Sequence, residues 1–267
     1  MQLAIGTTFD YQVPVEQQLI ELEDTVFTAI SLGANTVHSG YLHRQGQRKL
    51  LALSEKHRLE IDSLHVPFTR GYDLSHADSE SRMAAVCRVA LCLAAAVELT
   101  CPTAIVHLNH FSPKGYQQNV DSLLYSLDVL IESAENMKIN IAAENLYDSI
   151  SLEFLERALA EFKSERFGFC YDSSHDLLSG NEPYRILEKY ADRLLAVHLS
   201  DNDGREDCHW ISFTGQVDWE RICSILKESG YSGSLLLEVE NREEKETAQF
   251  LQEASDAALR LRGMING

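Results

Sequence analysis

Short apolar runs alternate with amphipathic segments along the whole chain. The run Leu3–Gly6 predicts a strand, and apolar residues at helical spacing over positions 15–30 predict the helix that follows it. The same alternation recurs to the C-terminus. Further strands are predicted at positions 36–38, 59–66, 103–108, 139–144, 167–172, 194–199 and 234–238. Further helices are predicted at positions 79–97, 120–134, 152–159, 183–190 and 219–226, with a polar helix after the last strand.

This alternation favours a parallel sheet whose strands are joined by helical crossovers. Eight strand–helix units in a chain of 267 residues fit a closed barrel better than an open sheet, so the predicted fold is α/β, a (β/α)8 TIM barrel. The hydrophobic content of 45% supports one large core, and no linker or low-complexity segment divides the chain. We therefore expect a single domain over residues 1–267.

The formal net charge of −18 narrows the range of partners. A protein that binds the nucleic-acid backbone needs a basic surface to replace counterions, and this chain should repel polyanions at long range. Most of the acidic surface is explained by solubility, and part of it is available to hold metal cations. We therefore expect a small-molecule substrate rather than nucleic acid.

The ends of the chain and its cysteines indicate where the protein works. The N-terminus enters a strand without a basic region or cleavage site, and no apolar stretch is long enough to span a bilayer. The six cysteines contain no C-x-x-C pair and are expected to be reduced thiols in the cytoplasm. Cys208 is the thiol expected inside the functional site.

Six of the predicted strands end in a residue that can bind a metal. These residues are His65, His107, Glu144, Asp172, His198 and Glu238, and His110 follows the fourth strand. The C-terminal ends of barrel strands surround one mouth, so these side chains are expected to converge. Buried carboxylates are costly unless a charge compensates them, and a divalent cation bound by carboxylate and imidazole does so. The sequence therefore predicts at least one divalent metal at the mouth.

The loop after the seventh predicted strand adds three candidates. Asp207 and His209 are expected to reach the metal or the substrate from this loop. Arg205 either binds a hydroxyl or phosphate oxygen of the substrate or is an ordinary exposed loop arginine.

The order of these strand ends resembles the xylose isomerase-like TIM-barrel superfamily. That group includes sugar and sugar-phosphate isomerases and epimerases, inosose dehydratases and apurinic-site endonucleases. The resemblance covers almost the whole chain. It rests on His65-Val-Pro-Phe, Glu144-Asn145, Asp172-Ser-Ser-His175, His198-Leu-Ser-Asp-Asn, Val217-Asp218-Trp219 and Leu-Glu238. Members of this group often pair, so a homo-oligomer is an open expectation.

The two branches of the superfamily imply different metal counts. In the isomerase and epimerase branch, the resemblance implies one Mn, Zn, Co or Mg ion held by Glu144, Asp172, His198 and Glu238. It also implies that Glu144 and Glu238 act as the catalytic acid–base pair, and that His175 contacts substrate oxygens. In the endonuclease branch it implies three metals. Their ligands would be the same four residues together with His65, His107, His175, Asp207 and His209.

Several functions stay open at this stage. The leading hypothesis is a metal-dependent isomerase or epimerase of a small sugar, polyol or keto-acid, working through a metal-stabilised enediolate. A dehydratase of the inosose or dehydroshikimate type would share the first half of that reaction. A multinuclear-zinc apurinic-site endonuclease or phosphodiesterase is the second hypothesis. A barrel that only binds a ligand is the third, and the intact set of carboxylates argues against it.

Overall fold

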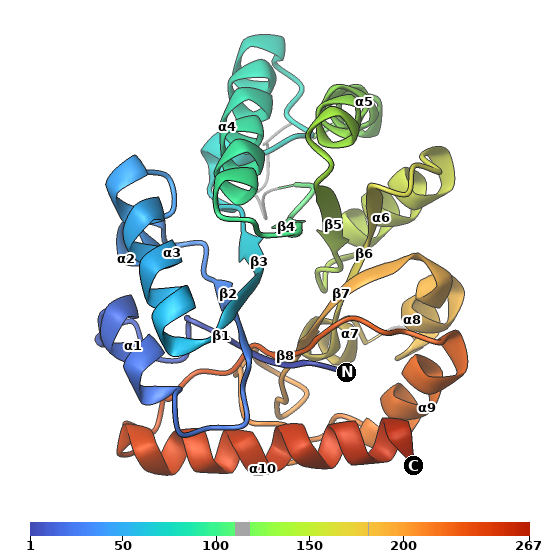
Figure 1. Ribbon diagram of the computed structural model, residues 1–267. Helices are drawn as coiled ribbons and strands as arrows, with labels where there is room; N and C mark the ends of the chain where they lie inside the picture. Colours follow the sequence, from blue (N-terminus) through green and yellow to red (C-terminus); the bar gives the residue numbers. More distant parts are fainter. Residues whose placement is uncertain (110–117, 181) are drawn as a thin grey trace.

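The computed structural model describes residues 1–109, 118–180 and 182–267 of the chain; His110 therefore lies outside the described residues. Eight parallel strands close into a barrel, in which β1 pairs with both β2 and β8. Figure 1 shows the helices as an outer ring around the strands, with α10 along one side. The predicted (β/α)8 TIM barrel is confirmed.

The strands are short and are joined mainly by helices. The strands are β1 (Leu3–Gly6), β2 (Ala29–Leu32), β3 (Glu60–His65), β4 (Thr103–Val106), β5 (Asn140–Glu144), β6 (Phe167–Asp172), β7 (Leu194–Leu199) and β8 (Leu235–Leu237). The α-helices are α1 (Val15–Glu21), α2 (Thr36–Ser39), α3 (Arg44–His57), α4 (Ser79–Glu98), α5 (Val120–Met137), α6 (Ser149–Glu161), α7 (Ser173–Leu178), α8 (Arg185–Tyr190), α9 (Trp219–Ser229) and α10 (Thr247–Asn266). Two 3₁₀ turns, η1 (Arg70–Tyr72) and η2 (Ala191–Arg193), complete the described elements.

The prediction of a second strand at positions 36–38 is wrong. Those residues form the short helix α2, because the Asn35 side chain accepts hydrogen bonds from the backbone N–H groups of Val37 and His38 and caps a helical turn. The second strand is β2, whose four residues are all buried. Ile30 lies in β2 and not on the predicted helix face, since so short an apolar run does not distinguish a strand from a helical turn. Helix α3 was not predicted.

Small side chains fill part of the barrel directly beneath its mouth. Ile105, Ala142, Cys170 and Ala196 form a separate buried cluster. Each stands two residues before a predicted site residue near or just beyond the end of the same strand, and side chains two apart in a strand share a face. The cluster therefore forms a packed floor below the mouth.

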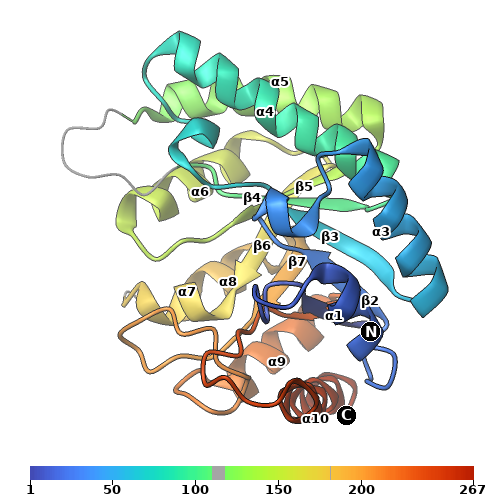
Figure 2. The ribbon, with the colours of Figure 1, turned by 90° about the vertical axis from the view of Figure 1, so that its left-hand side faces the viewer.

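The connection between β7 and α9 is tied down by Asp201. This carboxylate is buried and accepts hydrogen bonds from the backbone N–H groups of Asn202, Phe213 and Val217, each at 3.0 Å, and from the indole N–H of Trp219 at 2.9 Å. In Figure 2 this connection lies at the same end of the barrel as α7. The network holds the loop that carries Asp207 and His209 at the mouth.

Among the described residues, no helix is both long and apolar enough to cross a bilayer.

Candidate metal centre

Four side chains from four neighbouring strands converge at the mouth of the barrel. They are Glu144 at the end of β5, Asp172 at the end of β6, His198 on β7 and Glu238 just after β8. One donor atom of each lies within 4.8 Å of the donor atoms of the other three. His198 Nδ1 faces the carboxylates, at 2.8 Å from Glu238 Oε2, 3.6 Å from Glu144 Oε1 and 4.0 Å from Asp172 Oδ2. The arrangement surrounds one point with three carboxylates and one imidazole.

This group contains buried polar atoms without hydrogen-bond partners. They are Asp172 Oδ2 and both ring nitrogens of His198, for which no contact has hydrogen-bond geometry; the 2.8 Å contact between His198 Nδ1 and Glu238 Oε2 is an ion pair. Buried polar atoms are almost always paired, because leaving one unsatisfied costs about 1–3 kcal/mol. Carboxylate and imidazole donors at this spacing suit a divalent cation, which would satisfy these atoms and offset the carboxylate charge. The residues present therefore fit the predicted metal.

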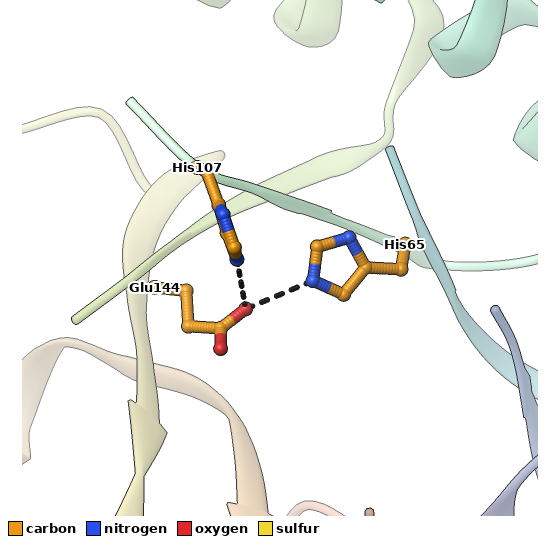
Figure 3. Close-up of side chains that lie close together, drawn as sticks. All are labelled: His65, His107 and Glu144. Carbon is orange, nitrogen blue, oxygen red and sulfur yellow. Dashed lines mark hydrogen bonds and ion pairs between the residues drawn. The ribbon is translucent and has the colours of Figure 1, made fainter. Parts of the chain in front are cut away.

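Glu144 also belongs to a second group of donors. Its Oε2 lies 3.0 Å from His65 Nε2 and 3.2 Å from His107 Nε2, as Figure 3 shows. The other nitrogen of His65 lies 2.8 Å from the backbone oxygen of Val66, which aims Nε2 into the site. His65, His107 and Glu144 meet the same spacing limit for metal ligands as the first group. Glu144 thus stands between two sets of imidazoles.

A third contact cluster is built around Asp207. Its Oδ2 lies 3.2 Å from His175 Nε2 and 3.2 Å from His209 Nε2. The Nδ1 atoms of these rings are held by backbone oxygens, that of His175 by Asn145 at 2.9 Å and that of His209 by Glu238 at 3.0 Å. Backbone contacts on one nitrogen therefore direct the other nitrogen toward the carboxylate.

Burial and neighbouring charge move the pKa values of the ligands in different directions. Burial raises the pKa of Asp172 to about 7. Burial also opposes ionisation of Glu238 and Glu144, yet the facing His198 outweighs it, lowering the pKa of Glu238 to about 2 and holding that of Glu144 well below its usual range. Burial disfavours the charged form of His198, but Cys170 and Glu238 raise its pKa well above the usual value. Without metal, protons on His198 and Asp172 therefore offset part of the buried negative charge.

A cavity of about 440 Å³ opens above these groups. Of the residues predicted for the site, seven line it, and they are His65, His107, Glu144, His175, Asp207, His209 and Glu238. Asp172 and His198 are buried beside them and complete the first group. Arg205 does not line the cavity; it is exposed on the β7–α9 loop, where its backbone N–H donates to Asp203 Oδ1. Cys208 does not line the cavity either.

The thiol that adjoins the site is Cys170 rather than the predicted Cys208. Its Sγ lies within 4.8 Å of ligand atoms of Glu144 and His198. Cys170 stands two residues before Asp172 on β6, so strand alternation alone places both side chains on one face. This alternation is the sequence signal that identifies Cys170 as a neighbour of the site. The pairing of β7 with β6 brings His198 next to the thiol.

The chain belongs to the xylose isomerase-like TIM barrel family, whose model matches residues 22–259. It is 22% identical over 251 residues to fructoselysine 3-epimerase of Escherichia coli O157:H7, an alignment that spans 90% of each chain. It is also 33% identical over 87 residues to inosose dehydratase of Clostridium beijerinckii, which spans 26% of this chain and 29% of the relative. Relatives of this chain therefore include an epimerase and a dehydratase.

Two solved structures show the same fold. A D-tagatose 3-epimerase-like protein superimposes with a TM-score of 0.84 at 21% identity, over 100% of this chain and 98% of that one. An IOLI protein with a binding zinc atom gives a TM-score of 0.83 at 15% identity, over 98% of each chain. That barrel holds zinc, and this chain has groups of histidine, cysteine and carboxylate side chains at a spacing that could hold a metal ion.

The affinity of the four-residue group for zinc should fall steeply as pH falls from 8 to 6. Metal ligands must be deprotonated. His198, whose pKa is raised well above its usual value, must lose its proton throughout this range, and Asp172 must lose its proton below about pH 7. One released proton weakens apparent binding about tenfold per pH unit, so we expect at least about a 100-fold loss. Competition with a chelator of known affinity measures it, and a constant affinity between pH 6 and 8 would contradict the ligand assignment.

Replacing Cys170 should weaken metal binding without unfolding the barrel. His198 directs Nδ1 at the carboxylates, and Cys170 Sγ lies within 4.8 Å of a ring nitrogen of His198. Outer groups that position a metal-binding histidine typically contribute 10- to 100-fold in affinity. We expect Cys170→Ala to weaken zinc binding about 10-fold in the same chelator assay. Cys223→Ala, at a buried cysteine on α9, is the matched control and should leave affinity unchanged. Equal zinc affinities in the Cys170→Ala and Cys223→Ala variants would show that Cys170 does not support metal binding.

Proposed function

We propose that the chain is a divalent-metal-dependent epimerase or isomerase acting on a small sugar, polyol or keto-acid. The observation that carries this proposal is the placement of two glutamates, Glu144 and Glu238, on either side of His198 Nδ1 at the mouth of the barrel. All six cysteines are unpaired, and a cytoplasmic location stays a prediction.

The proposed roles follow from the surroundings of each carboxylate. A divalent metal, when bound, supplies Lewis-acid polarisation of a substrate carbonyl. One glutamate then accepts the proton from the carbon next to that carbonyl, and the other, protonated from solvent between turnovers, delivers a proton to the same or the adjacent carbon. Glu144 is oriented by His65 and His107 on Oε2 and by His175 near Oε1. The Glu238 side chain is 15% exposed and that of Glu144 is 1% exposed. Glu238 is therefore the better placed of the two to exchange protons with solvent.

The same first step serves a dehydratase, which would expel hydroxide after proton removal instead of returning the proton. The two outcomes differ in their products, because a dehydratase releases a molecule with one hydroxyl fewer. Product analysis therefore separates them within a single assay.

Substitution of either glutamate should abolish turnover while the protein stays folded. Positioned acids and bases typically contribute 10²- to 10⁴-fold, so Glu144→Gln and Glu238→Gln should each slow proton transfer by at least about 100-fold. Incorporation of deuterium from heavy water into a ketohexose such as D-tagatose, followed by NMR, measures the step directly. Metal content is measured on each variant, since both residues are also proposed ligands.

Glu153→Gln, at an exposed glutamate on α6, is the matched control and should exchange like the unmodified protein. Full exchange by both active-site variants, with metal bound, would show that the proposed acid–base pair is wrong.

A multinuclear phosphodiesterase or apurinic-site endonuclease is the second candidate, and one observation favours it. All nine residues that the endonuclease branch implies are present, and the contacts join them in three groups that share the mouth. The net charge of −18 opposes it, because duplex binding depends on basic surface.

Metal stoichiometry separates the two candidates. We expect elemental analysis of the purified protein to find about one divalent metal per chain, and we expect no cleavage of an abasic duplex at physiological salt. About three zinc ions per chain together with abasic-site cleavage would establish the endonuclease and exclude the epimerase.

A further inference from the structure

The cavity above the candidate metal centre has an aromatic side that the proposed chemistry does not use. Tyr11, Phe68 and Tyr147 line it and remain 45%, 49% and 41% exposed. They come from separate parts of the chain, following β1, β3 and β5. Large aromatic side chains this exposed at a pocket are typical of ligand contact surfaces.

Two of these rings lie directly against the candidate ligands. Phe68 stacks on His107 with ring centroids 4.7 Å apart and an interplanar angle of 21°, and it meets His65 edge-on at 5.4 Å. The Tyr147 ring lies 5.7 Å from that of His175. A molecule that reaches the metal centre therefore passes along aromatic faces.

Tyr11 adds a neutral hydroxyl to the same wall. Burial, together with the charges of Glu238 and Glu240, raises the pKa of Tyr11 to about 12, so its hydroxyl stays protonated at neutral pH. A β-carbon on Gly33 would lie 2.6 Å from Thr8 Cγ2 and 3.3 Å from the Tyr11 oxygen. Because Gly33 has no side chain, the space beside it is available to the Tyr11 hydroxyl. A neutral hydroxyl here can donate to or accept from a substrate hydroxyl.

Apart from histidines, the charged side chains that line the cavity among the described residues are all carboxylates. The described residues that line it include five carboxylates, namely Glu144, Asp148, Asp207, Glu238 and Glu240, and no lysine or arginine. Of the nearby cations, Arg242 is engaged by Glu240 Oε2 at 2.6 Å and by the backbone oxygen of Asp207 at 3.0 Å. Phosphate groups are normally bound by arginine, lysine or free helix N-termini. The N-terminus of α7, which begins at the site, is capped by Asp172.

We infer that this cavity selects a free, unphosphorylated sugar or polyol, whose carbon skeleton packs against Phe68 and Tyr147, and that it rejects the corresponding sugar phosphate. The inference rests on the proposed function and narrows its substrate class. Aromatic faces favour the C–H groups of a sugar. The Tyr11 hydroxyl and the carboxylate and imidazole groups at the mouth suit polyol hydroxyls, and the carboxylates repel a phosphate dianion.

The test compares a sugar with its own phosphate ester on metal-loaded full-length protein. Equilibrium binding of D-fructose and D-fructose 6-phosphate, and of D-tagatose and its 6-phosphate, is measured by calorimetry or by ligand-observed NMR. We expect each free sugar to bind at least about 10-fold more tightly than its ester. The difference should shrink at high ionic strength, because screening weakens the repulsion. Tighter binding of the esters would overturn the inference.

Variants locate the selection in the cavity. Phe68→Ala should weaken binding of the free sugar about 5- to 10-fold with metal content unchanged, and Glu240→Gln should improve binding of the ester relative to the sugar. Tyr125→Ala, at an exposed aromatic residue on α5, is the matched control and should change neither. Unchanged binding in Phe68→Ala would exclude the aromatic wall as the selecting surface.

The outcomes also separate this inference from the proposed function. If the esters bind more tightly and exchange deuterium, the substrate class is wrong and the epimerase stands. If no sugar or ester binds or exchanges, the proposed function fails and this inference falls with it.

Discussion

The structure of the mouth depends on one electrostatic constraint, which is the crowding of three carboxylates, two of them buried, around a single imidazole. Glu144, Asp172 and Glu238 all approach His198 Nδ1 within 4.0 Å. Ionised groups so close together in a protein interior are expensive unless positive charge compensates them. In the absence of metal, protons on His198 and Asp172 supply part of that compensation, as their raised pKa values indicate. A divalent cation would supply it more completely.

The barrel supports this cluster because its strands cannot move independently. The register pairs Asp172 with His198 and Glu144 with Cys170, so adjacent strands fix the ligands side by side. Beneath them, the close-packed cluster of Ile105, Ala142, Cys170 and Ala196 prevents the side chains from collapsing inward. Asp201 then anchors the loop that brings Asp207 to His175. Rigid elements of this kind hold a site to the precision that catalysis requires.

The position of Glu144 links the alternative functions. Its two oxygens face different sets of imidazoles, with His65 and His107 on one and His175 and His198 on the other. In the proposed one-metal epimerase, the first pair would orient Glu144 as an acid–base group; in a multinuclear site, the same pair would be metal ligands. The same residues thus fit either chemistry, and the charge and shape of the surrounding cavity decide between them. The aromatic wall and the carboxylates around this cavity favour a small neutral substrate.

The sequence by itself was sufficient for the barrel and for the residues that converge at its mouth. Both follow from local rules, since strand–helix alternation specifies a parallel sheet and a polar residue at the end of an apolar strand must lie at one end of the barrel. Only the tertiary structure decided that Ala29–Leu32 is the second strand, because a mostly apolar run of four residues fits either a strand or a helical turn until neighbouring strands pair with it. It also placed Cys170 beside His198, left Arg205 exposed and brought Tyr11, Phe68 and Tyr147 to one cavity. Those relations join segments far apart in the chain, and packing between strands and loops determines them.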